Sequence, residues 1–160
     1  MHHDDIAKTF LKYFQKHQHL LIESTSLVPK EIDPSALFTN SGMHPIKNYF
    51  LGVEKPPAKR LCSLQRCFRT IDIDSVGMNG RTLTFFFMLG SWSVGDYWKQ
   101  EAIKLAYELL VKEYKFDKKK LWVSVFKGNK EVHKDKETLE AWKSIGIKQI
   151  VELDEKHNFW

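Results

Sequence analysis

The residues best suited to chemistry in this chain are one arginine and a run of aromatic side chains downstream of it. Arg69 ends a strand candidate that begins at Leu61, and Phe85, Phe86 and Phe87 stand side by side in a near-continuous apolar run. A guanidinium carries a permanent charge and planar paired donors that match phosphate oxygens, and a phenyl ring offers a flat apolar face to a purine. From the residues alone, two plainer interpretations stay open: a surface ion pair for the arginine and an ordinary core for the phenylalanines.

Four segments extend this pattern into a resemblance to a known family. Cys67–Thr70 is followed by TFFFMLGSWSVGDY at Thr84–Tyr97, and SLVP at Ser26–Pro29 precedes DPSALFTNSGM at Asp33–Met43. Together they resemble the second signature motif, and the segment before it, of the alanyl-tRNA synthetases, a family of class II aminoacyl-tRNA synthetases. The resemblance runs in register from about residue 10 to about residue 126, and more thinly to residue 160.

The resemblance implies roles for several residues in binding ATP. Arg69 corresponds to the motif arginine that meets the α-phosphate and is the catalytic candidate, and Phe86 corresponds to the ring against adenine. Met88 and Arg81 are further ATP-binding candidates, with Arg66 as another cation of interest. A fixed guanidinium suits the task of stabilising the charge that grows on phosphate oxygens as pyrophosphate leaves.

A turn upstream supplies two candidates for the substrate pocket. Thr39–Met43 contains Asn40 and Met43, and in the family this turn approaches the nucleotide and the amino acid. Gly42 allows the backbone to come close to a ligand. The alternative, in which Asn40 caps the start of a helix, remains open.

Three positions inside the ATP motif depart from the family. Phe87 stands where the family has an acidic residue, Ser91 where it has asparagine, and Thr82 or Leu83 where it has histidine. A phenylalanine in place of glutamate removes a charge that could orient substrate or metal. These departures favour a rival interpretation, a non-catalytic paralogue that keeps the fold as a nucleotide- or RNA-binding module. A third interpretation is a plain α+β domain without a ligand.

As a whole, the resemblance implies an alanine–tRNA ligase, which activates alanine with ATP and transfers it to tRNA, with Mg²⁺ accompanying the ATP and no zinc in this chain. The family's third motif has no counterpart here, and neither has its carboxylate for the alanine amine. The chain is therefore interpreted as a truncated or split N-terminal portion of a catalytic domain, without anticodon, editing or C-terminal domains. The expected partners are tRNA, alanine and a second polypeptide that supplies the missing segments.

Composition sets broad limits on the class of protein. Domains typically hold about 100–150 residues, so residues 1–160 are expected to form a single domain. The 25 Lys and Arg against 20 Asp and Glu give a net charge of +5, which favours a polyanion such as tRNA. No apolar run approaches the ~18–20 residues that span a bilayer, and the N-terminus lacks the pattern of a signal peptide. We therefore expect a cytoplasmic chain without a membrane partner.

The two cysteines and the histidines give no sign of a metal site. Cys62 and Cys67 are five residues apart on a predicted strand, so they should face opposite sides and remain reduced. No histidine stands at a recognisable ligand spacing from them. The expectation is a chain that holds no metal of its own.

Hydrophobic periodicity and turn residues predict the elements that must position these side chains. Asp4 or Asp5 is expected to cap a first helix that ends near His17, and Asp96 to cap a long helix that ends near Tyr114. Strand alternation should turn Phe85 and Phe87 away from Phe86. The other predicted elements are strands at 20–22, 61–69, 83–89, 121–126 and 147–153, helices at about 44–50 and 137–145, and a working loop at 70–82. This order predicts an α+β fold with a mainly antiparallel sheet flanked by helices, similar to an incomplete class II synthetase core.

Overall fold

The computed structural model describes residues 2–29 and 36–158, which fall into two compact units, Met1–Asp96 and Tyr97–Trp160. Each unit is described separately. Residues 33–35 of the segment that resembles the synthetases lie outside the described residues. The expectation of a single domain stays a prediction.

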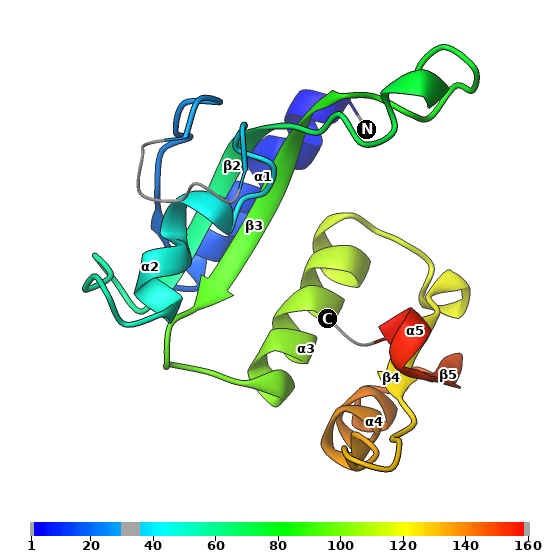
Figure 1. Cartoon of the computed structure of the whole chain (residues 1–160). Helices are drawn as coiled ribbons and strands as arrows, with labels where there is room; N and C mark the ends of the chain where they lie inside the picture. The colour runs from blue at the N-terminus through cyan, green and yellow to red at the C-terminus, as the bar shows by residue number, and fades with distance from the viewer. Residues whose placement is uncertain (1, 30–35, 159–160) are drawn as a thin grey trace. The chain divides into compact units, whose positions relative to one another are not determined.

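Unit 1 is built around a long hairpin (Figure 1). Strand order in its sheet is β1-β2-β3, with β1 parallel to β2 and β2 antiparallel to β3, and α1 packs against β2 and β3. The elements are α1 (His3–Lys16), β1 (Leu20–Leu21), η1 (His44–Ile46), α2 (Lys47–Phe50), β2 (Arg60–Phe68), η2 (Ile73–Ser75) and β3 (Phe85–Ser93).

Unit 2 pairs two short strands with helices. The strand β4 runs parallel to β5, and α3 packs against α4. The elements are α3 (Lys99–Glu108), a π-helical turn η3 (Leu109–Glu113), η4 (Lys118–Lys120), β4 (Val123–Phe126), α4 (Lys136–Ser144), β5 (Ile150–Leu153) and α5 (Glu155–Asn158).

The α+β class is confirmed, but the sheet of unit 1 is mixed and the described strand pair of unit 2 is parallel. The antiparallel prediction holds for the central hairpin, whose nine residue pairs run from Arg60 and Ser93 to Phe68 and Phe85. Direction cannot be read from hydrophobic alternation, which is the same in either orientation. Between β4 and β5 the chain passes through α4, and a connection of that length returns the second strand in parallel.

The predicted cap of the first helix is wrong. His2 occupies the N-cap position: its imidazole accepts from the backbone N–H of Asp4, and the Asp5 carboxylate accepts from the N–H of His2. This reciprocal arrangement satisfies two amide donors at the helix start, and an imidazole nitrogen can perform it as well as the expected carboxylate. The helix buries Phe10, Tyr13 and Phe14.

The prediction that Asp96 caps the next helix is also wrong. α3 begins at Lys99, and its N-cap is Trp98 without a side-chain hydrogen bond. Asp96 instead forms an ion pair with Nε of Arg60, at the other end of the β2–β3 hairpin from Arg69. An aspartate before a helical pattern predicts a cap only as long as no cation competes for its carboxylate.

The core of unit 1 includes both cysteines as free, fully buried thiols. Burial raises the pKa of the Cys62 thiol to about 11. The remaining buried hydrophobic residues are Phe10, Tyr13, Phe14, Ile46 and Leu61 in unit 1 and Ile103, Leu105, Leu109, Val125, Phe126, Leu139 and Ile147 in unit 2. Among the described helices, none is both long and apolar enough to cross a membrane.

Candidate functional site

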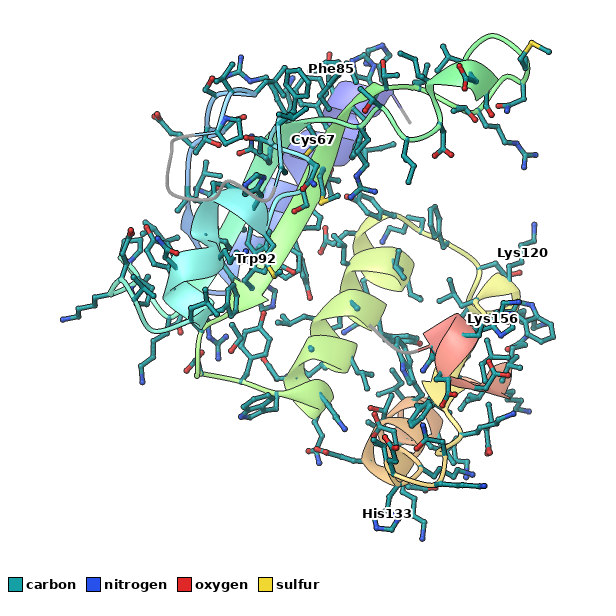
Figure 2. The ribbon with its side chains drawn as sticks, viewed as in Figure 1. Cys67, Phe85, Trp92, Lys120, His133 and Lys156 are labelled. Atoms are coloured by element: carbon teal, nitrogen blue, oxygen red, sulfur yellow. The ribbon has the colours of Figure 1, made fainter. Side chains whose placement is uncertain are left out.

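One face of the β2–β3 hairpin carries Phe86 and Met88, two of the predicted ATP-binding residues. Residues paired across an antiparallel ladder share a face, and Phe86, Met88 and Trp92 alternate along β3 opposite Cys67, Gln65 and Leu61. Figure 2 shows Cys67 and Trp92 along this hairpin. Met88 therefore joins Phe86 on one surface, here called the Phe86 face.

Arg69 lies over this face just beyond the end of β2. Its guanidinium carbon is 5.2 Å from the centroid of the Phe86 ring, within the range of a cation–π contact. Nε of Arg69 donates to the Asn40 carbonyl at 2.8 Å. Across the residues that the structure describes, Arg69 forms no ion pair, so the surface ion pair considered above is not formed there. The terminal guanidinium nitrogens form no hydrogen bond with the residues that the structure describes.

Phe85 and Phe87 lie on the opposite face of the same strand. Their rings are 5.4 Å apart in an edge-to-face arrangement, and they are 43% and 56% exposed. The predicted separation of these two rings from Phe86 is confirmed. Arg66 pairs with Phe87 in the ladder and hydrogen bonds to Ser24, which places this cation on the other face as well.

The Thr39–Met43 segment passes across the Phe86 face. The backbone N–H of Gly42 donates to the Met88 sulfur at 3.1 Å. A Cβ at Gly42 would lie 3.0 Å from the Trp92 indole, and one at Gly90 would lie 2.0 Å from it. The indole therefore lies over two glycines, and the segment comes this close to the sheet only because both positions lack a side chain.

Asn40 contributes its backbone carbonyl, which accepts from Arg69. The alternative role as a helix cap is not observed, because the hydroxyl of Ser41 accepts from His44 N–H at that turn. Met43 directly precedes η1 and is 50% exposed. A role for Asn40 and Met43 in a substrate pocket stays a prediction.

A chain of hydrogen bonds holds the Asn40 carbonyl in place. The buried Gln65 amide accepts from Thr25 N–H at 2.9 Å and donates to the Thr25 carbonyl at 3.2 Å. The hydroxyl of buried Thr39 donates to the Ser26 carbonyl at 2.8 Å. The backbone of Thr39 accepts from Phe68 N–H at 3.0 Å and donates to the carbonyl of residue 27 at 2.8 Å. We call Gln65, Thr25, Thr39 and Asn40 the Thr39 relay, since together they fix an acceptor for Arg69.

The Thr39 relay was missed from the sequence. A glutamine in the middle of the predicted strand was the available signal, because a buried amide needs several hydrogen-bond partners. Glycines such as Gly42 and Gly90 indicate that another group can lie close to the backbone, but they do not indicate which group it is.

Arg81 belongs to the loop between the strands and is not brought to the Phe86 face by any described contact. Its backbone N–H donates to Asn79 Oδ1 at 2.9 Å, and Thr82 N–H donates to the same oxygen at 2.8 Å. Asn79 thus organises the loop tip, and Arg81 is exposed there. Its ATP-binding role stays a prediction.

A cavity of about 280 Å³ lies beside the Thr39 relay. It shares Thr25 and Thr39 with the relay but excludes Arg69 and Phe86, so a nucleotide on the Phe86 face would bind outside it. Its lining consists of Thr25, Ser26, Val28, Pro29, Thr39, His44, Pro45, Lys47, Asn48, Tyr49 and Glu54.

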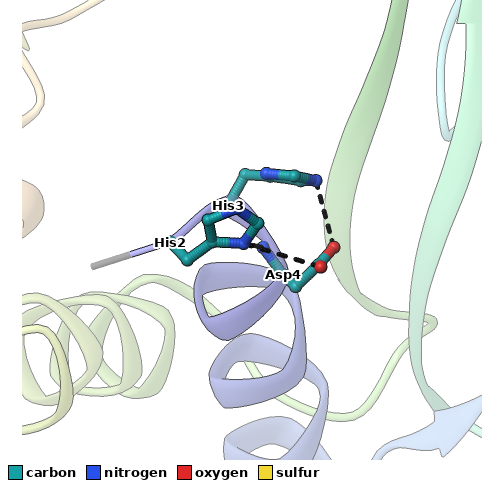
Figure 3. A group of neighbouring side chains, drawn as sticks. All are labelled: His2, His3 and Asp4. Atoms are coloured by element: carbon teal, nitrogen blue, oxygen red, sulfur yellow. Dashed lines mark hydrogen bonds and ion pairs between the residues drawn. The ribbon is translucent and has the colours of Figure 1, made fainter.

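One cluster in the described part of the chain has the composition of a metal site. Ligand atoms of His2, His3 and Asp4 lie within 4.8 Å of one another, and all three residues are exposed (Figure 3). His2 is committed to capping α1, and the partial positive charge of a helix N-terminus opposes a cation. Cys67 is unsuited to metal or nucleophilic chemistry, because burial raises the pKa of its thiol despite the Arg69 charge nearby.

Comparison with known proteins identifies the class to which this fold and site belong. Residues 5–160 match the family described as tRNA synthetases class II (A). The chain belongs to this family of class II synthetases. The match covers the hairpin, Arg69 and the Thr39 relay together.

The proteins similar to this chain over nearly its whole length include alanine–tRNA ligases. The chain is 45% identical over 159 residues to the alanine–tRNA ligase of Ureaplasma parvum serovar 3, covering 98% of this chain and 17% of that protein. It is 43% identical over 160 residues to the alanine–tRNA ligase of Caldicellulosiruptor saccharolyticus, with the same two coverages. It is 42% identical over 163 residues to that of Jannaschia sp., covering 98% of this chain and 18% of that protein. The chain thus spans less than a fifth of the length of these relatives.

Proposed function

We propose that the chain is part of an alanine–tRNA ligase and contributes the ATP-binding hairpin to the activation of alanine and its transfer to tRNA. The observation that carries the proposal is the position of Arg69, held over Phe86 by the Asn40 carbonyl with its terminal nitrogens left without a described protein partner. In alanine activation, the alanine carboxylate attacks the α-phosphorus of ATP and pyrophosphate leaves. A guanidinium fixed beforehand stabilises the charge on the phosphate oxygens without reorganising during the reaction.

Phe86 and Arg69 fit two parts of one nucleotide. With 5.2 Å between the guanidinium carbon and the ring centroid, a nucleotide whose α-phosphate meets Arg69 has its adenine within reach of the half-buried Phe86 ring. Stacking and exclusion of water stabilise a purine on such a ring. Met88 contributes apolar surface beside it on the same face.

Mg²⁺ belongs to the proposal only as a companion of ATP. The residues that form the Phe86 face and the Thr39 relay include no carboxylate, so these side chains do not fit a resident Mg²⁺ site. Mg²⁺ bound with nucleotides is held largely by phosphates and water. Cys62 and Cys67, on opposite faces of β2, do not fit one zinc ion.

The groups that bind the alanine ammonium and pyrophosphate are proposed to lie on other segments. The ammonium of alanine needs a carboxylate and pyrophosphate needs more cations, and the described contacts of Arg69 include neither. We propose that these groups come from further segments of the same or a second polypeptide, which complete one catalytic domain with a mainly antiparallel sheet, in the cytoplasm. The partners are tRNA and alanine.

The rival function is a nucleotide- or RNA-binding paralogue without catalysis, for which Phe87 is the specific observation. The ladder assigns Phe87 to the face opposite Phe86 and Arg69, and it is 56% exposed. Its replacement of the acidic residue of the family therefore leaves the composition of the Phe86 face unchanged. This favours the ligase over the rival.

The test is ATP binding by the full chain, measured by isothermal titration calorimetry. Arg69→Ala should weaken binding about ten- to hundredfold, the effect of losing charge-assisted hydrogen bonds worth ~1.5–3 kcal/mol. Arg66→Ala is the matched control, because it removes the same charge from the other face of the hairpin. Equal losses in the two variants, or ATP affinity unchanged by Arg69→Ala, would reject the proposed site.

A further inference from the structure

Unit 2 carries a basic surface that the ATP site does not use. Among the described residues, six of the fourteen lysines in this unit form ion pairs. Lys99, Lys104, Lys112, Lys127, Lys134 and Lys143 each form an ion pair with a carboxylate. The exposed Lys118, Lys119, Lys120 and Lys148 form none with the carboxylates that the structure describes. The exposed Lys115, Lys130, Lys136 and Lys156 form no such ion pair either, but only Lys118–Lys120 places three such lysines consecutively.

Lys118, Lys119, Lys120 and Lys148 are held beside one another by contacts of Gln149 and Gly146. The Gln149 side chain donates to the Lys119 carbonyl, which ties the 3-10 turn Lys118–Lys120 to the chain beside Lys148. The Lys118 ammonium lies 3.1 Å from the position of a Cβ on Gly146, at the end of α4. Figure 2 shows Lys120 on this turn. Asp117 is the acidic residue within the turn region, and its carboxylate accepts from Lys119 N–H as a cap.

An aromatic side chain completes the surface. Trp122 follows the three lysines and is 70% exposed. The next residue, Val123, starts β4 and donates its N–H to the Gln149 carbonyl at 3.0 Å, so the backbone that carries the indole is fixed beside Lys148. We call Lys118, Lys119, Lys120, Lys148 and Trp122 the Trp122 surface.

From this combination we infer that the Trp122 surface binds single-stranded RNA. Uncompensated ammonium groups attract the phosphate backbone, and an exposed indole stacks on an unpaired base. An apolar protein partner fits this surface poorly, since covering the indole would also remove four lysines from water without offering them anions. The inference rests on the proposed function, in which tRNA is the substrate, and assigns an unpaired part of such an RNA to unit 2.

The test is fluorescence anisotropy with a labelled 12-nucleotide single-stranded RNA and the full chain at several salt concentrations. A Lys119→Ala, Lys120→Ala, Lys148→Ala triple variant should lose about tenfold or more in affinity at low salt, and its dependence of log affinity on log salt should flatten by about 2. The control is a Lys104→Ala, Lys112→Ala, Lys143→Ala triple variant, which removes the same charge from ion-paired positions. It should stay within about twofold of wild type.

Substitutions at Trp122 give an independent test of RNA binding. Trp122→Ala should weaken single-strand binding roughly 5- to 150-fold, whereas Trp122→Phe keeps a stacking ring and should retain most of the affinity. A blunt RNA duplex of the same length should be insensitive to Trp122→Ala, because its bases are already stacked. Circular dichroism verifies that each variant is folded. Equal losses in both lysine triples, or Trp122→Ala with unchanged affinity, would overturn the inference.

ATP titration separates this inference from the proposed function. The triple variant at Lys119, Lys120 and Lys148 should bind ATP like wild type, and Arg69→Ala should bind the RNA like wild type. ATP binding that depends on Arg69 together with RNA binding that ignores Trp122 rejects the surface alone. RNA binding through Trp122 in a chain that binds no ATP rejects the ligase proposal instead.

Discussion

Thr39→Val tests whether the Thr39 relay positions Arg69. The substitution keeps the branched shape and removes only the hydroxyl, which donates to the Ser26 carbonyl at 2.8 Å. Thr39 is 3% exposed, so its hydroxyl is largely shielded from bulk solvent. A buried carbonyl left without its donor costs about 1–3 kcal/mol. For a unit of this size, a loss of 1 kcal/mol lowers the melting temperature by about 4–8 °C.

The effect on ATP should be smaller than that of removing Arg69 itself. The backbone of Thr39 still bonds to Phe68 and to the carbonyl of residue 27, so the segment stays in place while the Asn40 carbonyl becomes less well fixed. We expect ATP affinity to fall about three- to tenfold, between no effect and the ten- to hundredfold loss that a charge-assisted bond represents. Thr39→Ser restores the hydroxyl and should recover both stability and affinity.

The decisive assay is a double-mutant cycle by isothermal titration calorimetry with ATP. If Thr39 acts through Arg69, Thr39→Val should have no further effect on the residual affinity of Arg69→Ala, since the residue it positions is gone. A second readout needs no ATP: the Nε–H resonance of Arg69 should exchange faster with solvent in Thr39→Val. The reasoning is refuted if Thr39→Val lowers ATP affinity by the same factor with and without Arg69.

Three further predictions concern the hairpin. Phe86→Leu should weaken adenine nucleotides several-fold in a calorimetric titration, whereas Phe87→Leu, on the exposed face, should leave affinity unchanged; loss in both or neither contradicts the stacking role. Gly90→Ala places a Cβ 2.0 Å from an indole carbon and should lower the melting temperature by several degrees, while Gly80→Ala, with nothing within 4 Å, should not; equal melting would contradict the close approach. The pKa of Cys62 is about 11 in the folded chain and 9.0 as its ordinary value, so the unfolded chain loses this proton first and stability should fall as pH rises from 9 to 11. Urea unfolding at pH 8 to 11 should show a shallower decline in Cys62→Ala, and identical slopes would refute this.

Short-range pattern was enough to predict the hairpin and the faces of its strands. Alternation separates Phe86 from Phe85 and Phe87, and the ladder bears this out because opposite residues in an antiparallel pair share a face. The helix predicted at about 137–145 forms as Lys136–Ser144, and Gly146 follows it with a φ of +82°, a conformation that glycine adopts readily. These features depend on residues a few positions apart.

The tertiary structure alone decided what surrounds Arg69. Its acceptor is a backbone carbonyl 29 residues away in an irregular segment, and the Gln65 amide that anchors that segment bonds to Thr25 across 40 residues. Every residue carries the same backbone carbonyl, so the residue types do not predict which carbonyl will accept a hydrogen bond from Arg69. The helix caps also depended on the tertiary structure. Asp96 does not cap α3, because its carboxylate pairs with Arg60, which is remote in sequence. Side-chain chemistry was thus readable from the sequence, whereas the partners were set by long-range packing that brings distant backbone together.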